Sequence, residues 1–218
     1  MPLRLFALVF CVASLGAVVS GAPETWQAEI DALTAADAAQ PPPPGAVLFV
    51  GSSSIRLWAS LADDFPGETI IQRGFGGSEL ADSVFYFDRI VAPYRPRAVV
   101  LYAGDNDIAA GRTAEQVLAD FLDFRARLRA VLPDTRLVFL AIKESPARAQ
   151  VRGEARRANQ MIAGACWRDP HCRFVDVAAT LLNADGTFRT ELFEADELHI
   201  NRTGYAAWAA VVAPALAK

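Results

Sequence analysis

Five short runs of apolar and β-branched residues recur along this chain, and they constrain its fold more than any other feature. Continuous runs of this kind are typical of strands that are covered on both faces, as in a parallel sheet. Helical patterns separate the runs, so we predict an α/β protein: a three-layer α/β/α sandwich around a five-stranded parallel sheet with right-handed crossovers. The expected strands are residues 46–50, 69–72, 98–103, 136–142 and 173–177.

The helical patterns carry their own start and stop signals. The clearest helix begins at Thr113, a candidate N-cap with Gln116 three residues later, and it has Val117, Phe121 and Leu128 on one side. Pro133 ends this pattern. In an open parallel sheet, ligands bind at the carboxyl ends of the strands, so we expect the site there. Further helices are expected at residues 24–39, 79–91, 151–165 and 203–216.

The first 22 residues have the pattern of a secretion signal. Arg4 gives a positive start, residues 5–19 are almost entirely apolar, and small residues at 20–22 suit cleavage. A membrane anchor is the alternative, but the apolar stretch is shorter than the roughly 20 residues that a spanning helix needs. We therefore expect residues 1–22, with Cys11, to be removed from a secreted or periplasmic protein that has no stable membrane insertion.

The remainder suits one domain with a substantial core, because 53% of the 218 residues are hydrophobic and no repeat is visible. The four prolines from Pro41 to Pro44 form a stiff connector. We expect residues 23–44 to form an N-terminal helix with this connector, and residues 45–218 to form the main domain.

The charge pattern argues against nucleic acid as a partner. Without the signal the chain keeps 20 basic and 25 acidic residues, about −5 net, and no concentrated basic face is visible. Four arginines do cluster, but acidic residues interrupt them, so we interpret them as a solvated helix face. They are Arg148, Arg152, Arg156 and Arg157.

Two cysteines remain after the signal. Cys166 and Cys172 lie six positions apart, and in an exported protein such a pair is expected to be oxidised, with two separate buried thiols as the alternative. A metal site is not expected there, because only His171 lies nearby and zinc requires four suitable ligands. We expect no cofactor.

A serine, a base and an acid are available for nucleophilic catalysis. The turn 51–54 follows the first strand, where a serine would be exposed above helix-terminal N–H groups. A serine hydroxyl needs a base, and His199 is the best candidate because His171, the other histidine, lies in a turn-rich segment. Asp196, three residues before His199, would orient the imidazole and stabilise the imidazolium.

Two further loops offer hydrogen-bond donors for an oxyanion. Residues 74–77, Gly-Phe-Gly-Gly, follow the second strand and can bring backbone N–H groups close to a ligand. Asn106 follows the third strand and offers a side-chain amide. A nucleophile, a base and oxyanion donors are together what acyl transfer requires.

These residues resemble the SGNH or GDSL hydrolases, in four blocks that stand in the family's order. That family is named for a serine in Gly-Asp-Ser, a glycine in a second block, an asparagine in Gly-x-Asn-Asp and a histidine in Asp-x-x-His. The corresponding blocks here are residues 51–53, 72–77, 104–107 and 196–199, within a resemblance that spans residues 47–205.

The resemblance implies the flavodoxin-like SGNH hydrolase fold and the hydrolysis of an ester-type bond. It assigns Ser53, Asp196 and His199 as catalytic residues. It assigns Ser53, Gly77 and Asn106 to the oxyanion hole. Substrates in the family include acetylated sugars, lysophospholipids and short esters, so a small-molecule, glycan or lipid ester is the expected partner; the lack of a lid-like insertion favours short-acyl esters.

Two positions depart from the family pattern. Ser52 stands where the family has Asp, and Gln72 stands where Asn is usual. The first departure leaves three adjacent serines. Chemistry alone does not choose among Ser52, Ser53 and Ser54, so the choice of Ser53 rests on the resemblance.

Other functions fit parts of the pattern. A flavodoxin-like binding protein could cradle a phosphate at the serine turn, and an inactive relative could bind glycans. The polar segment 143–146 fits a substrate-contacting loop and an ordinary polar loop equally, so we assign none of it to the site. A metal hydrolase could use Asp105, Asp107, Asp196 and His199.

Overall fold

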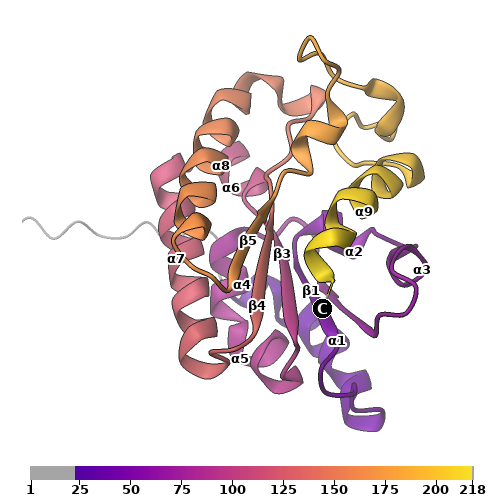
Figure 1. The fold of residues 1–218 in the computed structure, drawn as a ribbon, viewed down its shortest axis with the longest axis vertical. Helices are drawn as coiled ribbons and strands as arrows, with labels where there is room; N and C mark the ends of the chain where they lie inside the picture. The colour runs from indigo at the N-terminus through magenta and orange to yellow at the C-terminus, as the bar shows by residue number, and fades with distance from the viewer. Residues whose placement is uncertain (1–22, 218) are drawn as a thin grey trace, which may run out of the picture.

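The computed structural model describes residues 23–217, in which a five-stranded sheet lies between two layers of helices (Figure 1). The strand order is β2-β1-β3-β4-β5, and every neighbouring pair is parallel. The prediction of a three-layer α/β/α fold is therefore confirmed, whereas the expected signal at residues 1–22 lies outside the described residues. The strands are β1 (Val47–Gly51), β2 (Ile70–Gly74), β3 (Ala98–Tyr102), β4 (Arg136–Leu140) and β5 (Cys172–Val175).

Successive residues of the central strands pack into two separate cores. In β1, Leu48 and Val50 join the core on one face, and Val47 and Phe49 join the core on the other. All four side chains are fully buried. Because both faces are covered, apolar residues occupy consecutive positions, which explains the continuous runs in the sequence.

The helices divide between the two faces of the sheet (Figure 1). Helices α1, α4, α5, α7 and α8 cover one face, and α2, α3 and α9 cover the other. Within residues 23–217, no helix has both the length and the apolar content needed to cross a membrane. The helices are α1 (Gln27–Ala39), α2 (Ser53–Arg56), α3 (Leu61–Asp64), α4 (Leu80–Phe85), α5 (Phe87–Ile90), α6 (Asp105–Ala109), α7 (Ala114–Val131), α8 (Arg152–Trp167) and α9 (Arg202–Leu216).

Two of the expected helices show how local signals succeed and fail. The Thr113 hydroxyl accepts the Gln116 amide and the Gln116 side chain accepts the Thr113 amide, so the predicted N-cap of α7 is confirmed. The single helix expected at residues 79–91 is instead broken into α4 and α5. The break falls at Tyr86, which leaves helical geometry (φ −87°, ψ 7°) and buries its ring edge-on against Phe75.

Helix α1 packs directly on the main fold. Its Ile30 side chain is fully buried in the core on the α7 and α8 face. Asp37 accepts hydrogen bonds from Arg73 and from the Tyr94 hydroxyl, both at 2.5 Å. These contacts hold α1 against β2, close to the loop that follows that strand.

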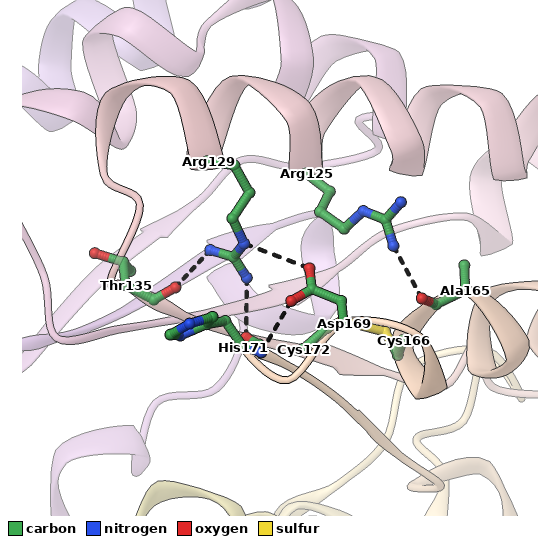
Figure 2. Close-up of a disulfide and its surroundings, with 8 residues drawn as sticks. All are labelled: Arg125, Arg129, Thr135, Ala165, Cys166, Asp169, His171 and Cys172. Carbon is green, nitrogen blue, oxygen red and sulfur yellow. Dashed lines mark hydrogen bonds and ion pairs between the residues drawn. A yellow bond between two sulfur atoms is a disulfide. The ribbon is translucent and has the colours of Figure 1, made fainter.

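A disulfide joins Cys166, near the end of α8, to Cys172 at the start of β5 (Figure 2). The guanidinium of Arg129 donates to the carbonyl of His171 (3.0 Å) and lies 3.4 Å from Asp169, so arginine and disulfide close the same loop. This cluster lies at the amino edge of the sheet, opposite the carboxyl edge where the first three strands end.

At Gly51 the end of β1 lies close against the end of β3. This glycine adopts a φ of 138°, and a Cβ at this position would lie 1.8 Å from the Tyr102 carbonyl oxygen. No side chain fits there without moving β1 away from β3.

We therefore expect Gly51→Ala to lower the free energy of unfolding by about 3 kcal/mol, from steric overlap and backbone strain. Urea denaturation followed by circular dichroism measures this. Gly164→Ala is the matched control, because a Cβ at Gly164, inside α8, meets nothing within 4 Å. The control should be neutral or stabilising by up to about 1 kcal/mol. Equal effects of the two substitutions would contradict the packing described here.

Candidate active site

The serine turn lies directly after β1, at the carboxyl edge of the sheet. The Ser52 amide donates to the Tyr102 carbonyl (3.0 Å), and the Phe75 amide donates to the Gly51 carbonyl (2.9 Å). These bonds hold the ends of β1, β2 and β3 together. Ser53 then begins the short helix α2, so its side chain lies at this edge.

Ser53, His199 and Asp196 form a continuous chain of hydrogen bonds. The Nε2 atom of His199 lies 3.0 Å from the Oγ of Ser53, and its Nδ1 atom lies 2.6 Å from the Oδ2 of Asp196. With the Nδ1 proton directed at the carboxylate, Nε2 is an acceptor for the serine hydroxyl. The imidazole is thus placed to take the Ser53 proton.

The loop that carries Asp196 and His199 is held by its own backbone. The Oδ1 atom of Asp196 accepts the amides of Leu198 and His199, each at 2.9 Å. Glu197 takes a left-handed φ of 56°, and the Glu194 amide donates to the His199 carbonyl (2.7 Å). The side-chain hydrogen bond from His199, helped by the two amides, lowers the pKa of Asp196 to about 2. The carboxylate is therefore ionised near neutral pH.

The other two serines have different surroundings. The Ser52 hydroxyl is buried and has no hydrogen-bond partner within the described chain. The Ser54 hydroxyl lies 3.3 Å from the Nζ of Lys143. Among the three serines that the sequence left open, Ser53 is the one whose hydroxyl meets the imidazole.

Two backbone amides near this edge, those of Ser53 and Gly77, have no hydrogen-bond acceptor among the described residues. Gly77 adopts a left-handed φ of 73°, which glycine takes without steric cost. Within residues 23–217, neither the Gly77 amide nor the Ser53 amide donates to another group, whereas the Gly76 amide donates to Glu29 (3.2 Å). The turn after β2 therefore offers one free donor next to one that helix α1 already uses.

Asn106 is connected to the same turn. Its Nδ2 donates to the carbonyl of Ser78 (2.9 Å), the residue after Gly77, and its Oδ1 accepts from Arg148 (2.9 Å). The second Nδ2 hydrogen has no acceptor in the part of the chain described here. Asn106, predicted as a donor, is thus bonded to the residue that directly follows Gly77, the other predicted donor.

The two aspartates of the 104–107 block bind other groups than the histidine. Asp105 pairs with Lys143 (2.5 Å) and Arg148 (3.3 Å). Burial acts to raise the pKa of Asp105, but these two cations outweigh it and lower that pKa below its ordinary value. Asp107 accepts the Leu80 amide with both oxygens (3.0 and 3.2 Å), and burial raises its pKa to about 7.

The metal-hydrolase alternative finds no support in this arrangement. Asp105 and Asp107 are engaged away from Asp196 and His199. No group of three or more histidine, cysteine, aspartate or glutamate side chains in residues 23–217 is placed to hold one metal ion.

Lys143, in the segment 143–146 after β4, lies against this site, although the sequence pattern alone assigned none of that segment to it. The Lys143 side chain is 1% exposed and donates to Ser54, to the Tyr102 hydroxyl (3.1 Å) and to Asp105. One feature of the sequence indicated that this segment belongs to the site: it begins at the carboxyl edge of the sheet, where the blocks after the first three strands also begin. Its composition alone did not distinguish it from a surface loop.

The interpretation of the arginine cluster as a solvated helix face is wrong for two of its members. The Arg148 side chain is 22% exposed and contacts Asp105 and Asn106. Arg152 is 32% exposed and pairs with the buried Glu144 (2.6 Å). Half-exposed Arg156 also pairs with Glu144, and half-exposed Arg157 pairs with Glu115 on α7. Two buried carboxylates, Asp105 and Glu144, hold Arg148 and Arg152 against the fold, and the alternating charges in the sequence do not reveal this burial.

A cavity of about 500 Å³ opens beside His199 and Asp196. Apolar and charged side chains together form its walls. They include Leu57, Ile200, Tyr205, Glu194 and Arg202.

Comparisons with known proteins agree with this architecture. Three solved structures share the fold at low identity. A Streptococcus pneumoniae protein assigned as a platelet activating factor is 19% identical with a TM-score of 0.79, over 88% of this chain and 94% of that chain. A GDSL-like lipase from Bacteroides thetaiotaomicron is 18% identical with a TM-score of 0.69, over 88% and 96%.

A more distant neighbour is a mutant of an acetyl-xylooligosaccharide esterase from Geobacillus stearmophilus, 13% identical with a TM-score of 0.63, over 77% of this chain and 93% of that chain. No curated protein matches this chain. The family model described as GDSL-like Lipase/Acylhydrolase matches residues 25–207, which is most of the chain. The chain therefore belongs to the GDSL-like lipase/acylhydrolase family.

Proposed function

We propose that this protein is a secreted serine esterase that cleaves its substrate through an acyl-enzyme on Ser53. One observation carries the proposal: the Ser53 hydroxyl, the His199 imidazole and the Asp196 carboxylate are linked by hydrogen bonds of 3.0 and 2.6 Å. Membership of an acylhydrolase family supports the same reaction class.

In the first half of the reaction, Ser53 Oγ attacks the ester carbonyl carbon while its proton passes to His199 Nε2. Asp196 stabilises the resulting imidazolium through its Nδ1–H bond. The carbonyl oxygen becomes an oxyanion, for which the amides of Ser53 and Gly77 and the side chain of Asn106 are the candidate donors. A donor of this kind contributes about 10² to 10³ in rate.

The tetrahedral intermediate then breaks its bond to the leaving oxygen. His199 Nε2 returns the proton to that oxygen, the alcohol departs, and the acyl group remains on Ser53. In the second half a water gives a proton to Nε2 and attacks the acyl carbon. The attack forms a second tetrahedral intermediate. As the bond from the acyl carbon to Ser53 Oγ breaks, His199 Nε2 returns the proton to Oγ, which releases the carboxylic acid and restores the Ser53 hydroxyl.

We propose a small ester with a short acyl group as the substrate. Trp26 lies over the glycine turn: a Cβ on Gly77 would lie 3.4 Å from the end of its ring, and the ring packs against Phe75. Helix α1 adds Glu29, bound to the Gly76 amide. This cover restricts the space beside the proposed oxyanion hole. The fold neighbour that acts on acetylated xylooligosaccharides supports acetylated sugars as one such class.

Secretion is part of the proposal. The signal pattern of residues 1–22 motivates it, and the disulfide between Cys166 and Cys172 supports an oxidising compartment. The N-terminal sequence of protein recovered from the periplasm or medium tests it. An uncleaved chain retained in the cytoplasm would refute it.

We expect Ser53→Ala to lower kcat for nitrophenyl acetate by about 10⁴-fold or more, because the attacking oxygen is lost. Ser52→Ala is the matched control: its hydroxyl has no hydrogen-bond partner within the described chain, so activity should stay within about threefold of the wild type. Steady-state kinetics of both purified variants give the answer. Retention of activity in Ser53→Ala would refute the proposed nucleophile.

The pH dependence should show a loss of activity in acid. A protonated imidazole cannot accept the Ser53 proton, so kcat/KM measured between about pH 5 and about pH 8 should be lowest at the acid end. Asp196, with its pKa lowered to about 2, stays ionised over this range, whereas Asp107, whose pKa burial raises to about 7, titrates within it; Asp107→Asn should therefore keep the acid loss if His199 is its source. A flat profile over this range would count against His199 as the base.

A panel of nitrophenyl esters tests the acyl preference. Because Trp26 and α1 cover the turn beside the site, kcat/KM should fall at least about tenfold between the butyrate and decanoate esters. Acetylated xylooligosaccharide and lysophospholipid complete the panel. Faster hydrolysis of the long-chain esters would overturn the proposed preference for short acyl groups, but it would leave the proposed roles of Ser53, His199 and Asp196 unchanged.

A further inference from the structure

The loop after β4 sends Arg148 to the candidate oxyanion donor Asn106. One guanidinium nitrogen donates to Asn106 Oδ1 (2.9 Å), and the other lies 3.3 Å from the Asp105 carboxylate. We propose that Arg148 is a positioning residue that fixes and polarises the Asn106 amide for oxyanion binding. This inference rests on the proposed function and extends it to a residue outside the four sequence blocks.

The two neighbours of the amide allow it only one orientation. Arginine has donors and no acceptor, so it can face only the Oδ1 of Asn106. The Ser78 carbonyl has only acceptors, so it can face only Nδ2, which it does at 2.9 Å. A flipped amide would set donor against donor and acceptor against acceptor. Arg148 and Ser78 thus hold one Nδ2 hydrogen free, and Asn106 meets an arriving oxyanion without reorientation.

The same contact strengthens the donor. A hydrogen bond from a cation to the amide oxygen draws electron density from the nitrogen, so the free N–H becomes a better donor to negative charge. The Arg148 side chain is 22% exposed, and Lys143 beside it is 1% exposed, so solvent screens the two cations weakly. The Asp105 carboxylate neutralises one of these two positive charges. The remaining positive charge favours an anion at Asn106.

The loop that carries Arg148 is anchored at both sides of the site. The Arg148 amide donates to the Ser145 carbonyl (3.1 Å), and the Ala147 amide donates to the carbonyl of Glu197 (3.1 Å), between Asp196 and His199. Arg148 therefore joins the oxyanion donor to the loop that carries the base.

Kinetics of Arg148→Ala with nitrophenyl acetate test the proposal. We expect kcat to fall about 10-fold to 100-fold with KM changed by less than about threefold, because the interaction strengthens only as the oxyanion forms. Arg148→Lys should recover part of kcat and Arg148→Gln should not, because only lysine keeps the charge. Arg157→Ala is the control: it removes one arginine of the same cluster, paired with Glu115 away from the site, and should stay within about twofold of the wild type.

A double-mutant cycle makes the test specific to Asn106. If Arg148 acts through Asn106, then Arg148→Ala should change kcat by less than about twofold in an Asn106→Ala background. Multiplicative effects in the double variant, or unchanged kcat in Arg148→Ala, would overturn the proposal. If Arg148→Ala does not fold, the comparison of Arg148→Lys with Arg148→Gln decides alone, and equal kcat values would overturn it. Loss of activity in Ser53→Ala would leave the proposed function standing in each of these cases.

Discussion

The contact between the ends of three strands is the constraint on which the rest of this structure depends. At Gly51 the backbone of β1 lies so close to Tyr102 of β3 that no side chain fits between them. The Phe75 amide, directly after β2, donates to the Gly51 carbonyl and so joins the end of β2 to the same point. The serine turn, the glycine turn and the Asn106 loop therefore start from one point, and their separation is set by main-chain hydrogen bonds. The backbone of the proposed nucleophile is thus held close to the two loops that carry the other proposed oxyanion donors.

His199 lies near the C-terminal end of the sequence, and several hydrogen bonds orient the loop that carries it. The Glu194 amide bonds to the His199 carbonyl and makes a tight loop. Asn201 then caps α9 by accepting the amides of Thr203 and Gly204. The Tyr205 hydroxyl, from the first turn of α9, donates to the carbonyl of Ser54 (2.9 Å). The helix that carries the histidine loop is thus bonded directly to the serine turn.

The features that could be predicted from the sequence are those that depend on neighbouring residues or on the topology of a parallel sheet. The apolar runs predicted all five strands, and the cap at Thr113 needed only Gln116. The carboxyl-edge rule predicted where the site lies, and the resemblance to the SGNH hydrolases predicted that Ser53 and His199, 146 residues apart, would act together. Chemistry alone left the three serines open, because the hydroxyl that meets the imidazole depends on how distant loops fold together. The contact between Arg148 and Asn106 joins flexible side chains 42 residues apart and leaves no periodic trace. The break at Tyr86 was hidden because tertiary burial of the ring overrides a helical pattern.

In the proposed reaction the Ser53 hydroxyl, activated by His199, is the nucleophile. Treatment of the native protein with a fluorophosphonate, followed by digestion and tandem mass spectrometry, tests this most directly, because the reagent bonds covalently to an activated serine. We expect one adduct, on Ser53, and its loss in His199→Ala. An adduct on Ser52 or Ser54, or labelling of Ser53 that does not depend on His199, would contradict the proposal.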